Sequence, residues 1–331
     1  MTQPIFNAAD NQRIVGVGSA LIDILINETD EFASLAGAAK GGMLYVEDAF
    51  IDTVIAKTEV RPEIVPGGSA CNTLIGIGQL GGDARFVGKL GDDEYGQLFR
   101  TSLIKSKVEP VLITSSSPTG RVLSIITPDA ERSMLTCLGA SAETMPEEIT
   151  SASFENTAIA LVEGYQLFNK VLTLAILKAA HTAEVRIALD LASFTVVQEA
   201  ETFLEQIVND YVDILIANED EARAFTGYTD EIQALRKLAE KSDLAVLKLG
   251  ERGSMIAYNG DITEVAATKG DGIIDTTGAG DLWASGFLFG LVNGFSMEKC
   301  GELGSACGYE VCQVIGAAIP EAGWKRIRTL L

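Results

Sequence analysis

The sequence predicts an α/β fold: a doubly wound, mainly parallel sheet with helices on both faces, and a small second β-sheet beside it. Two observations lead to this prediction. From residue 158 onward, short apolar runs of strand length alternate with longer runs of helical pattern, which indicates βαβ units around a parallel sheet. Before that, residues 111–137 contain short alternating strands bounded by turn residues, which is typical of an antiparallel sheet.

The N-terminal half is predicted to supply the first strands of the large sheet and the whole small sheet. Predicted strands are 13–17, 22–26, 43–46, 84–87, 111–114, 121–127 and 133–137. Predicted helices are 69–80, which ends at a Gly-Gly pair, and 92–107, which has its acids first and its lysines last. Gly16 and Gly18 begin a dinucleotide-binding pattern, but Leu21 replaces its third glycine, which argues against a dehydrogenase.

The C-terminal half continues the alternation to the end of the chain. Predicted strands are 158–162, 186–189, 214–217 and 245–249, with helices 170–183, 196–208, 219–226 and 231–240 between or after them. Asn259 and Gly260 indicate a hairpin of strands 255–258 and 262–265. Helices 282–293 and 297–315 close the chain. We expect one domain over residues 1–331, with the small sheet built from residues 24–65 and 108–138.

Composition narrows the possible classes of function. The chain has 331 residues, a formal net charge of −21 and an isoelectric point near 4.4, so we expect no nucleic-acid or membrane partner. The N-terminus lacks the pattern of a secretion signal, and the apolar run 282–292 is too short to cross a bilayer. Five cysteines without a C-x-x-C pair and a single histidine argue against a zinc site. We expect a cytoplasmic protein.

The residues Gly278-Ala279-Gly280-Asp281 open the apolar helix at 282–293. Small residues leave the first backbone N–H groups of a helix accessible, and the helix dipole makes that end attractive to anions. Asp281 would share this place with an incoming anion. A phosphoryl group in transit beside a general base explains two negative groups there; an N-capping Asp after a Gly-rich turn explains Asp281 equally well.

Three motifs together resemble one family. Residues 275–281 resemble the C-terminal signature of the ribokinase-like (PfkB) carbohydrate kinases, and residues 67–73 resemble their N-terminal substrate motif. The residues Asn218-Glu219-Asp220-Glu221 fit the family's Asn-x-x-Glu metal motif. The motifs occur in the family's order and span most of the chain. The resemblance implies a ribokinase-like kinase that uses ATP and Mg2+, with the small sheet as a lid over the substrate.

The resemblance also implies a role for each motif residue. Asp281 is expected to take the proton from the substrate hydroxyl, and the amides of Gly278, Ala279 and Gly280 to bind the transferred phosphoryl group. The implied substrate-binding residues are Asp23, Gly67, Gly68, Asn72 and Arg132. The implied nucleotide-binding residues are Asn218, Glu221, Lys248, Gly250 and Gly253, with Glu221 holding Mg2+ through water. Asp275 and the carbonyl of Thr277 correspond to a monovalent-cation (K+) site in some members.

The substrate is the least determined part of the resemblance. Residues 131–140 resemble the adenosine-kinase branch, where an arginine in the place of Arg132 reaches the phosphates; Arg132 fits a turn in a charged hairpin equally well. Ser19 stands where that branch places an asparagine beside the nucleoside. We expect phosphorylation of a primary hydroxyl on a ribose-containing nucleoside, with a sugar or sugar phosphate as the alternative. A ligand-binding member without catalysis is disfavoured by the intact Asp281, and both a monomer and a homodimer fit.

Overall fold

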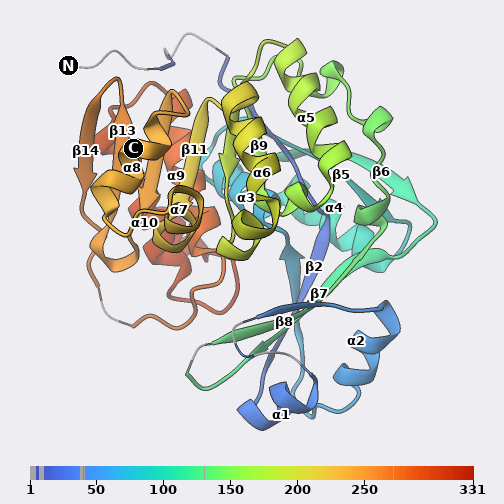
Figure 1. Cartoon of the computed structure of the whole chain (residues 1–331). Helices are drawn as coiled ribbons and strands as arrows, with labels where there is room; N and C mark the ends of the chain where they lie inside the picture. The colour runs from blue at the N-terminus through green and yellow to red at the C-terminus, as the bar shows by residue number, and fades with distance from the viewer. Residues whose placement is uncertain (1–4, 7–10, 38–39, 41, 130, 271) are drawn as a thin grey trace.

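The computed structural model describes residues 5–6, 11–37, 40, 42–129, 131–270 and 272–331. Within these residues, a nine-stranded sheet with helices on both faces forms the body of the molecule. A five-stranded sheet lies at one end of the body together with helices α1 (Asp30–Leu35) and α2 (Asp48–Ile55) (Figure 1). The predicted α/β architecture with a second, smaller sheet is therefore confirmed.

The large sheet has the strand order β14-β13-β12-β11-β10-β9-β1-β5-β6. All neighbours from β12 to β6 pair in parallel. The parallel strands are β12 (Leu244–Lys248), β11 (Ile214–Asn218), β10 (Arg186–Asp190), β9 (Ile159–Glu163), β1 (Ile14–Val17), β5 (Ala84–Gly91) and β6 (Val108–Ser115). The predicted hairpin, β13 (Ser254–Tyr258) and β14 (Asp261–Val265), adds antiparallel strands at one edge.

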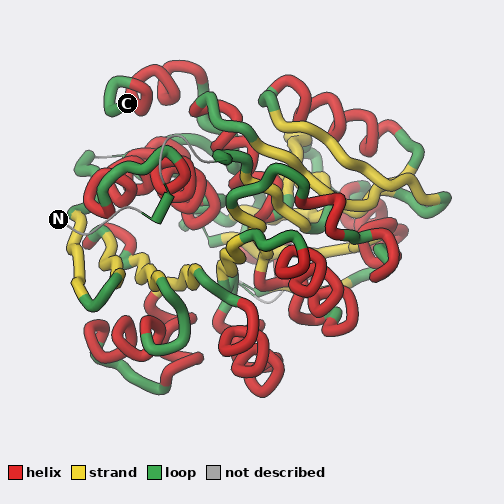
Figure 2. The backbone as a smooth tube through the Cα atoms, turned by 90° about the horizontal axis from the view of Figure 1, so that it is seen from above, coloured by secondary structure: helices red, strands yellow, loops and turns green. Residues whose placement is uncertain are grey.

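Strand alternation divides the apolar side chains into two cores, one on each face of the large sheet. Ile14 belongs to the first core and Val15 to the second, and both are fully buried. The first core includes side chains of α3 (Ser69–Leu80), α4 (Glu94–Lys105), α9 (Ala279–Val292), α10 (Met297–Val311) and α11 (Glu321–Arg328). The second includes those of α5 (Lys170–Thr182), α6 (Phe194–Tyr211), α7 (Glu219–Thr226) and α8 (Glu231–Ala239). Figure 2 shows helices on both sides of the sheet.

The small sheet has the order β3-β8-β7-β2-β4. Its strands are β2 (Leu21–Asn27), β3 (Met43–Tyr45), β4 (Glu63–Gly67), β7 (Thr119–Ile126) and β8 (Arg132–Gly139). The predicted antiparallel pairing of the segments 121–127 and 133–137 is confirmed. The sheet as a whole is mixed, because β2 pairs in parallel with β7, and β3 with β8.

One assignment to the small sheet is wrong. The segment 111–114 was expected there, but it lies in β6, which pairs in parallel with β5 at the edge of the large sheet. Helix α4 connects β5 to β6, so the three elements form a further βαβ unit. Within the described chain, the second segment of the small sheet therefore begins at β7, and the first begins with β2 at Leu21 rather than at 24.

Other boundaries differ by a few residues. Helix α9 begins at Ala279 and α10 ends at Val311, four residues before the predicted end. Among the described helices, none combines the length and the apolar character needed to span a bilayer.

Candidate active site

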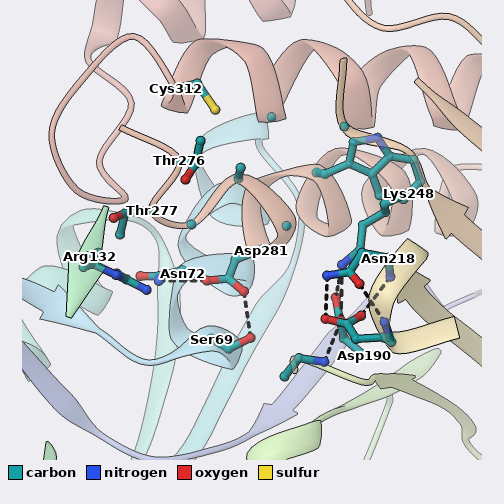
Figure 3. Close-up of a pocket in the computed structure, with 18 of the residues that line it drawn as sticks. Ser69, Asn72, Arg132, Asp190, Asn218, Lys248, Thr276, Thr277, Asp281 and Cys312 are labelled. Carbon is teal, nitrogen blue, oxygen red and sulfur yellow. Dashed lines mark hydrogen bonds and ion pairs between the residues drawn. The ribbon is translucent and has the colours of Figure 1, made fainter. Parts of the chain in front are cut away.

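A cavity of about 970 Å³ lies between the carboxyl ends of the parallel strands and the small sheet. Ligands bind at this end of open α/β sheets because the loops there converge. Figure 3 shows the cavity with Asp281 facing Ser69 and Asn72, and Lys248 facing Asp190. The predicted site residues that line it are Asp23, Gly68, Asn72, Arg132, Asn218, Glu221, Lys248, Gly250, Gly253, Thr277, Gly278, Ala279, Gly280 and Asp281. Gly67 and Asp275 are buried behind its wall.

The turn before α9 has the form of an anion site. Gly278 is the N-cap of α9 with φ 72°, and a Cβ on it would stand 2.7 Å from the Cβ of Ala317. The N–H of Ala279 donates to the carbonyl oxygen of Thr276 at 3.1 Å, so this one of the three expected amides is already engaged. The N–H groups of Gly278 and Gly280 have no acceptor among the described residues. Two amides at a helix N-terminus are thus available to an anion.

Asp281 is held by α3, which packs against α9. The hydroxyl of Ser69 donates to Asp281 Oδ1 at 2.7 Å, and the side-chain amide of Asn72 donates to Oδ2 at 3.0 Å. Thr73 Oγ1 donates to the backbone carbonyl of Asp281 at 3.1 Å. Burial raises the pKa of Asp281, although the hydrogen bonds from Asn72 and Ser69 oppose the rise. The carboxylate is therefore fixed in place and more basic than an exposed one.

Asp23 lies on β2 in the small sheet, facing the cavity. Its side chain is buried, and burial raises its pKa to about 6; Arg132 opposes the rise and Asp281 adds to it. Gly67 makes room for this carboxylate, because a Cβ on Gly67 would stand 2.4 Å from Asp23 Cγ. Gly68, with φ 92°, faces the carbonyl oxygen of Ser19, which would lie 2.5 Å from a Cβ there. The Gly-Gly pair thus serves close packing as well as the turn into α3.

Asn218 and Glu221 form a capping box at the start of α7. Asn218 donates from its backbone N–H and its side-chain amide to the two carboxylate oxygens of Glu221, each at 2.8 Å. The N–H of Glu221 donates back to Asn218 Oδ1 at 2.9 Å. Burial raises the pKa of Glu221 to about 7; the positive charge of Lys248 opposes this rise, and the negative charge of Asp190 adds to it. The two side chains thus bond each other, and both line the cavity.

Lys248, at the end of β12, forms an ion pair with Asp190, at the end of β10. Lys248 Nζ lies 2.9 Å from Asp190 Oδ2 and 3.2 Å from Oδ1, and the two side chains are only 12% and 8% exposed. Burial lowers the pKa of Lys248, but the carboxylates of Asp190 and Glu221 outweigh it and the pKa is raised. Gly250 (φ 55°) and Gly253 (φ 98°) follow, and a Cβ on Gly253 would meet the carbonyl oxygen of Val265 at 2.0 Å.

Residues 43–322 match the sequence pattern described as pfkB family carbohydrate kinase, which covers most of the chain. The chain belongs to the PfkB family of carbohydrate kinases. It is accordingly an ATP-dependent phosphotransferase acting on a sugar or nucleoside. Kinases of this family use ATP and typically Mg2+.

The known proteins that are similar to this chain are kinases with different names. A 5-dehydro-2-deoxygluconokinase of Bacillus subtilis is 30% identical over 72% of this chain and 78% of its own length. A ribokinase of Arabidopsis thaliana is 27% identical over 81% of this chain and 72% of its own. The solved structure of an adenosine kinase from Sinorhizobium meliloti superposes with a TM-score of 0.89 at 30% identity, covering 97% of this chain and 100% of that one.

The structure places further side chains in this PfkB site to which the resemblance gave no role, among them Ser69, Glu163 and Tyr165. Glu163, at the end of β9, is 2% exposed and accepts hydrogen bonds from the N–H groups of Ser19 at 3.0 Å and Ala70 at 2.9 Å. It thereby ties the segment after β1 to the first turn of α3. Its position at the carboxyl end of a parallel strand is a signal that sequence reasoning could have used.

Asp275 lies beneath the turn that precedes α9. Its carboxylate accepts from the N–H and hydroxyl of Thr277 at 2.9 and 2.7 Å, and from the N–H of Gly316 at 2.8 Å. It is 1% exposed, and no cationic side chain pairs with it among the described residues of this kinase. A buried carboxylate without a counter-charge is a place where a cation is favoured.

Proposed function

We propose that this PfkB kinase phosphorylates the primary hydroxyl of a ribose-containing nucleoside. The proposal rests mainly on the composition of the cavity wall that the small sheet forms. Its apolar lining residues are Leu21, Met43, Tyr45, Val122, Met134 and Leu138. Tyr45 packs edge-to-face on Phe168, with ring centroids 6.4 Å apart, so this wall contacts the body through an aromatic pair. Such a wall suits a nucleobase, because bases offer flat apolar faces that side chains of this kind can cover.

Polar groups that suit a ribose line the same cavity. Asp23 lies within the small-sheet wall beside Val122, whereas Asn72 and Asp281 come from the body, and carboxylates and amides are good partners for sugar hydroxyls. A free sugar carries hydroxyls on almost every carbon, so part of it would face the apolar wall without hydrogen-bond partners, which is unfavourable. The 30% identity to the adenosine kinase from Sinorhizobium meliloti, over nearly the full chain, supports the same choice.

A sugar or sugar-phosphate kinase is the second candidate. The curated relatives named 5-dehydro-2-deoxygluconokinase and ribokinase favour it, as does the Ser19 that replaces the expected asparagine. Arg132, which lines the cavity from β8, would suit a phosphate on such a substrate as well as the phosphates of ATP.

In the proposed reaction, the oxygen of the substrate hydroxyl forms a bond to the γ-phosphorus of ATP, and Asp281 accepts the proton of that hydroxyl. The bond between that phosphorus and its bridging oxygen breaks, and ADP leaves with the electron pair. The free N–H groups of Gly278 and Gly280 stabilise the negative charge on the transferred group. Ser69 and Asn72 orient the Asp281 carboxylate so that it faces the substrate hydroxyl.

The cavity fits ATP and a divalent cation. A Cβ would narrow the turn at Gly278 and Gly280. The hydroxyl of Ser305, which lines the cavity, is buried and has no hydrogen-bond partner among the described residues. Of the described residues that line the cavity, eight are carboxylates and three are basic, so an anionic nucleotide needs added positive charge. Asn218 and Glu221 would hold Mg2+, Glu221 through water, and the ion would neutralise phosphate charge. Lys248, Gly250 and Gly253 would line the nucleotide, and Asp275 with the Thr277 carbonyl would hold K+.

Thermal unfolding with and without ligand tests the proposed substrate class. A ligand that binds only the folded state raises the free energy of unfolding by RT ln(1 + [L]/Kd), and the unfolding midpoint rises with it. Purine nucleosides should raise it at concentrations where ribose and fructose do not. If only free sugars raise it, the sugar-kinase alternative holds.

A further inference from the structure

The ammonium group of Lys248 lies at the N-terminus of α9, beside the proposed anion site. A Cβ on Gly280, in the first turn of α9, would stand 3.2 Å from Lys248 Nζ. The group reaches this place from β12, and its partner Asp190 comes from β10, on the other side of β11. The ion pair therefore extends across the end of β11 toward the turn that holds Asp281.

Stability does not explain a lysine in this position. The N-terminus of a helix is its positive end, and a cation there is unfavourable by roughly 0.3–1 kcal/mol. A buried ion pair is itself weak support for stability, since desolvation offsets most of its attraction. Two positive groups that converge on one point are explained by an anion that comes between them.

Asp190 is held in a defined orientation. Its Oδ1 also accepts the N–H of Ala192 at 3.2 Å, and Ala192 adopts a left-handed conformation with φ 63°. A non-glycine residue in this region is strained, and such strain concentrates at functional sites. An ammonium group has three N–H donors. The two oxygens of Asp190 engage at most two of them, so at least one is free for a phosphoryl oxygen.

We propose that Lys248 contacts an oxygen of the phosphoryl group during its transfer, and that Asp190 holds the ammonium in place for this contact. Lys248 is then a catalytic residue and Asp190 a positioning residue. The inference rests on the proposed phosphoryl transfer at Asp281. Asp190 also supplies a counter-charge while no nucleotide is bound. The other charged groups that face Lys248 are Glu221 from α7 and Asp281 from α9.

Steady-state kinetics of three variants tests the pair. Lys248→Met should lower kcat by about 10²–10³, as loss of one transition-state donor does, with the KM for the acceptor changed by less than about threefold. Lys248→Arg should recover a large part of kcat because the charge returns. Asp190→Asn keeps the shape and should lower kcat at least about tenfold. The double variant Asp190→Asn/Lys248→Met should be no slower than Lys248→Met alone, because Asp190 acts only through Lys248.

The ion pair of Lys89 and Glu148 provides a matched control. It is also largely buried, with a separation of 2.7 Å and side-chain exposures of 7% and 26%, and neither residue lines the cavity. Lys89→Met should lower the unfolding midpoint and leave kcat near that of the wild type. If the losses of Asp190→Asn and Lys248→Met instead multiply in the double variant, or Lys248→Met changes only KM, the inference is wrong.

A binding measurement tests the role of Lys248 without any catalytic turnover. Mg·ADP with aluminium fluoride mimics the transferred phosphoryl group and can be titrated by calorimetry against Mg·ADP alone. Lys248→Met should reduce the gain in affinity from aluminium fluoride at least about tenfold and leave the affinity for Mg·ADP within about threefold. An equal loss for both ligands would make Lys248 an ordinary nucleotide contact. A wild-type protein that phosphorylates neither nucleosides nor sugars would overturn the proposed function and leave this titration decisive for Lys248.

Discussion

Asn72 donates its side-chain amide N–H to Asp281 Oδ2 at 3.0 Å, joining the first turn of α3 to the first turn of α9. The family resemblance assigned Asn72 to the substrate, and it remains a proposed substrate contact because its amide has a second N–H and an acceptor oxygen. In the structure its partner is the proposed base. Helix α3 thus supplies both donors that orient the Asp281 carboxylate, Ser69 and Asn72.

Replacing Asp281 with Asn tests the base directly. The change keeps the size of the side chain and removes its ability to accept a proton. We expect kcat to fall by about 10²–10⁴, the usual effect of losing a general base, while substrate binding measured by calorimetry survives. A variant that retains more than about a tenth of wild-type turnover would rule out Asp281 as the base.

Asn72→Ala should shift the pH dependence of catalysis. The Asn72 hydrogen bond lowers the pKa of Asp281 against the effect of burial, so its removal raises that pKa further. Since the base must be ionised, the acidic limb of the pH profile of kcat/KM should move to higher pH. Asn293, whose amide donates to the Phe289 carbonyl at the far end of α9, provides the control: Asn293→Ala should leave the limb in place. An unmoved limb in Asn72→Ala would mean that the hydrogen bond does not tune the base.

Substitutions at Gly280 test the anion site by added bulk. The added Cβ of Gly280→Ala would lie 3.2 Å from Lys248 Nζ, the flexible end of a side chain that can shift, so we expect a moderate loss of kcat. Gly280→Val adds two more methyl groups beside the free amide and should lower kcat by about 10²–10³. Gly280 lies within α9, where its backbone is helical, so both variants should fold, as circular dichroism will show. Full activity in a folded Gly280→Val protein would contradict an anion site there.

Asp23→Asn should affect stability and binding in opposite directions. Burial raises the pKa of Asp23 to about 6, so between its ordinary pKa and pH 6 the folded protein binds more protons than the unfolded chain. Stability therefore falls as pH rises through this range. Asp23→Asn should raise the unfolding midpoint at pH 7 and have no such effect at pH 4.

The same variant should also raise the KM for the acceptor, because a carboxylate that accepts substrate hydroxyls is lost. Glu63 on β4 is exposed, and Glu63→Gln is the matched control with no change in either quantity. A Tm that falls at pH 7 in Asp23→Asn would show that the buried charge is compensated.

The parallel body of the fold was predictable because its signals are local. Apolar runs bounded by turn residues gave strands β9 to β12 and the hairpin β13–β14 within a residue or two. The assignment of β6 failed because a strand's own residues do not tell which sheet it joins. Helices α1 and α2 have six and eight residues. Helices this short have little stability of their own and depend on tertiary packing, so their sequences carry only a weak helical pattern.

The motifs predicted which residues would meet at the site but not how they are connected. Asp281 and Asn72 lie 209 positions apart and were both expected there, yet nothing in either motif shows the hydrogen bond between them. The ion pair of Lys248 and Asp190 depends on the order of β10, β11 and β12 in the sheet. Glu163 could have been found, because it ends β9 as Asp190 ends β10, but its bond to the Ser19 N–H spans 144 positions.

The most direct test of the proposed function is a coupled assay for ADP release with Mg·ATP and a panel of acceptors. We expect turnover with purine nucleosides, none with 5′-deoxyadenosine, which lacks the primary hydroxyl, and little with ribose or fructose at equal concentration. 5′-Deoxyadenosine should still raise the unfolding midpoint, because it retains the base and most of the ribose. Turnover with free hexoses or pentoses alone would contradict a nucleoside substrate and assign this protein to the sugar kinases of its family.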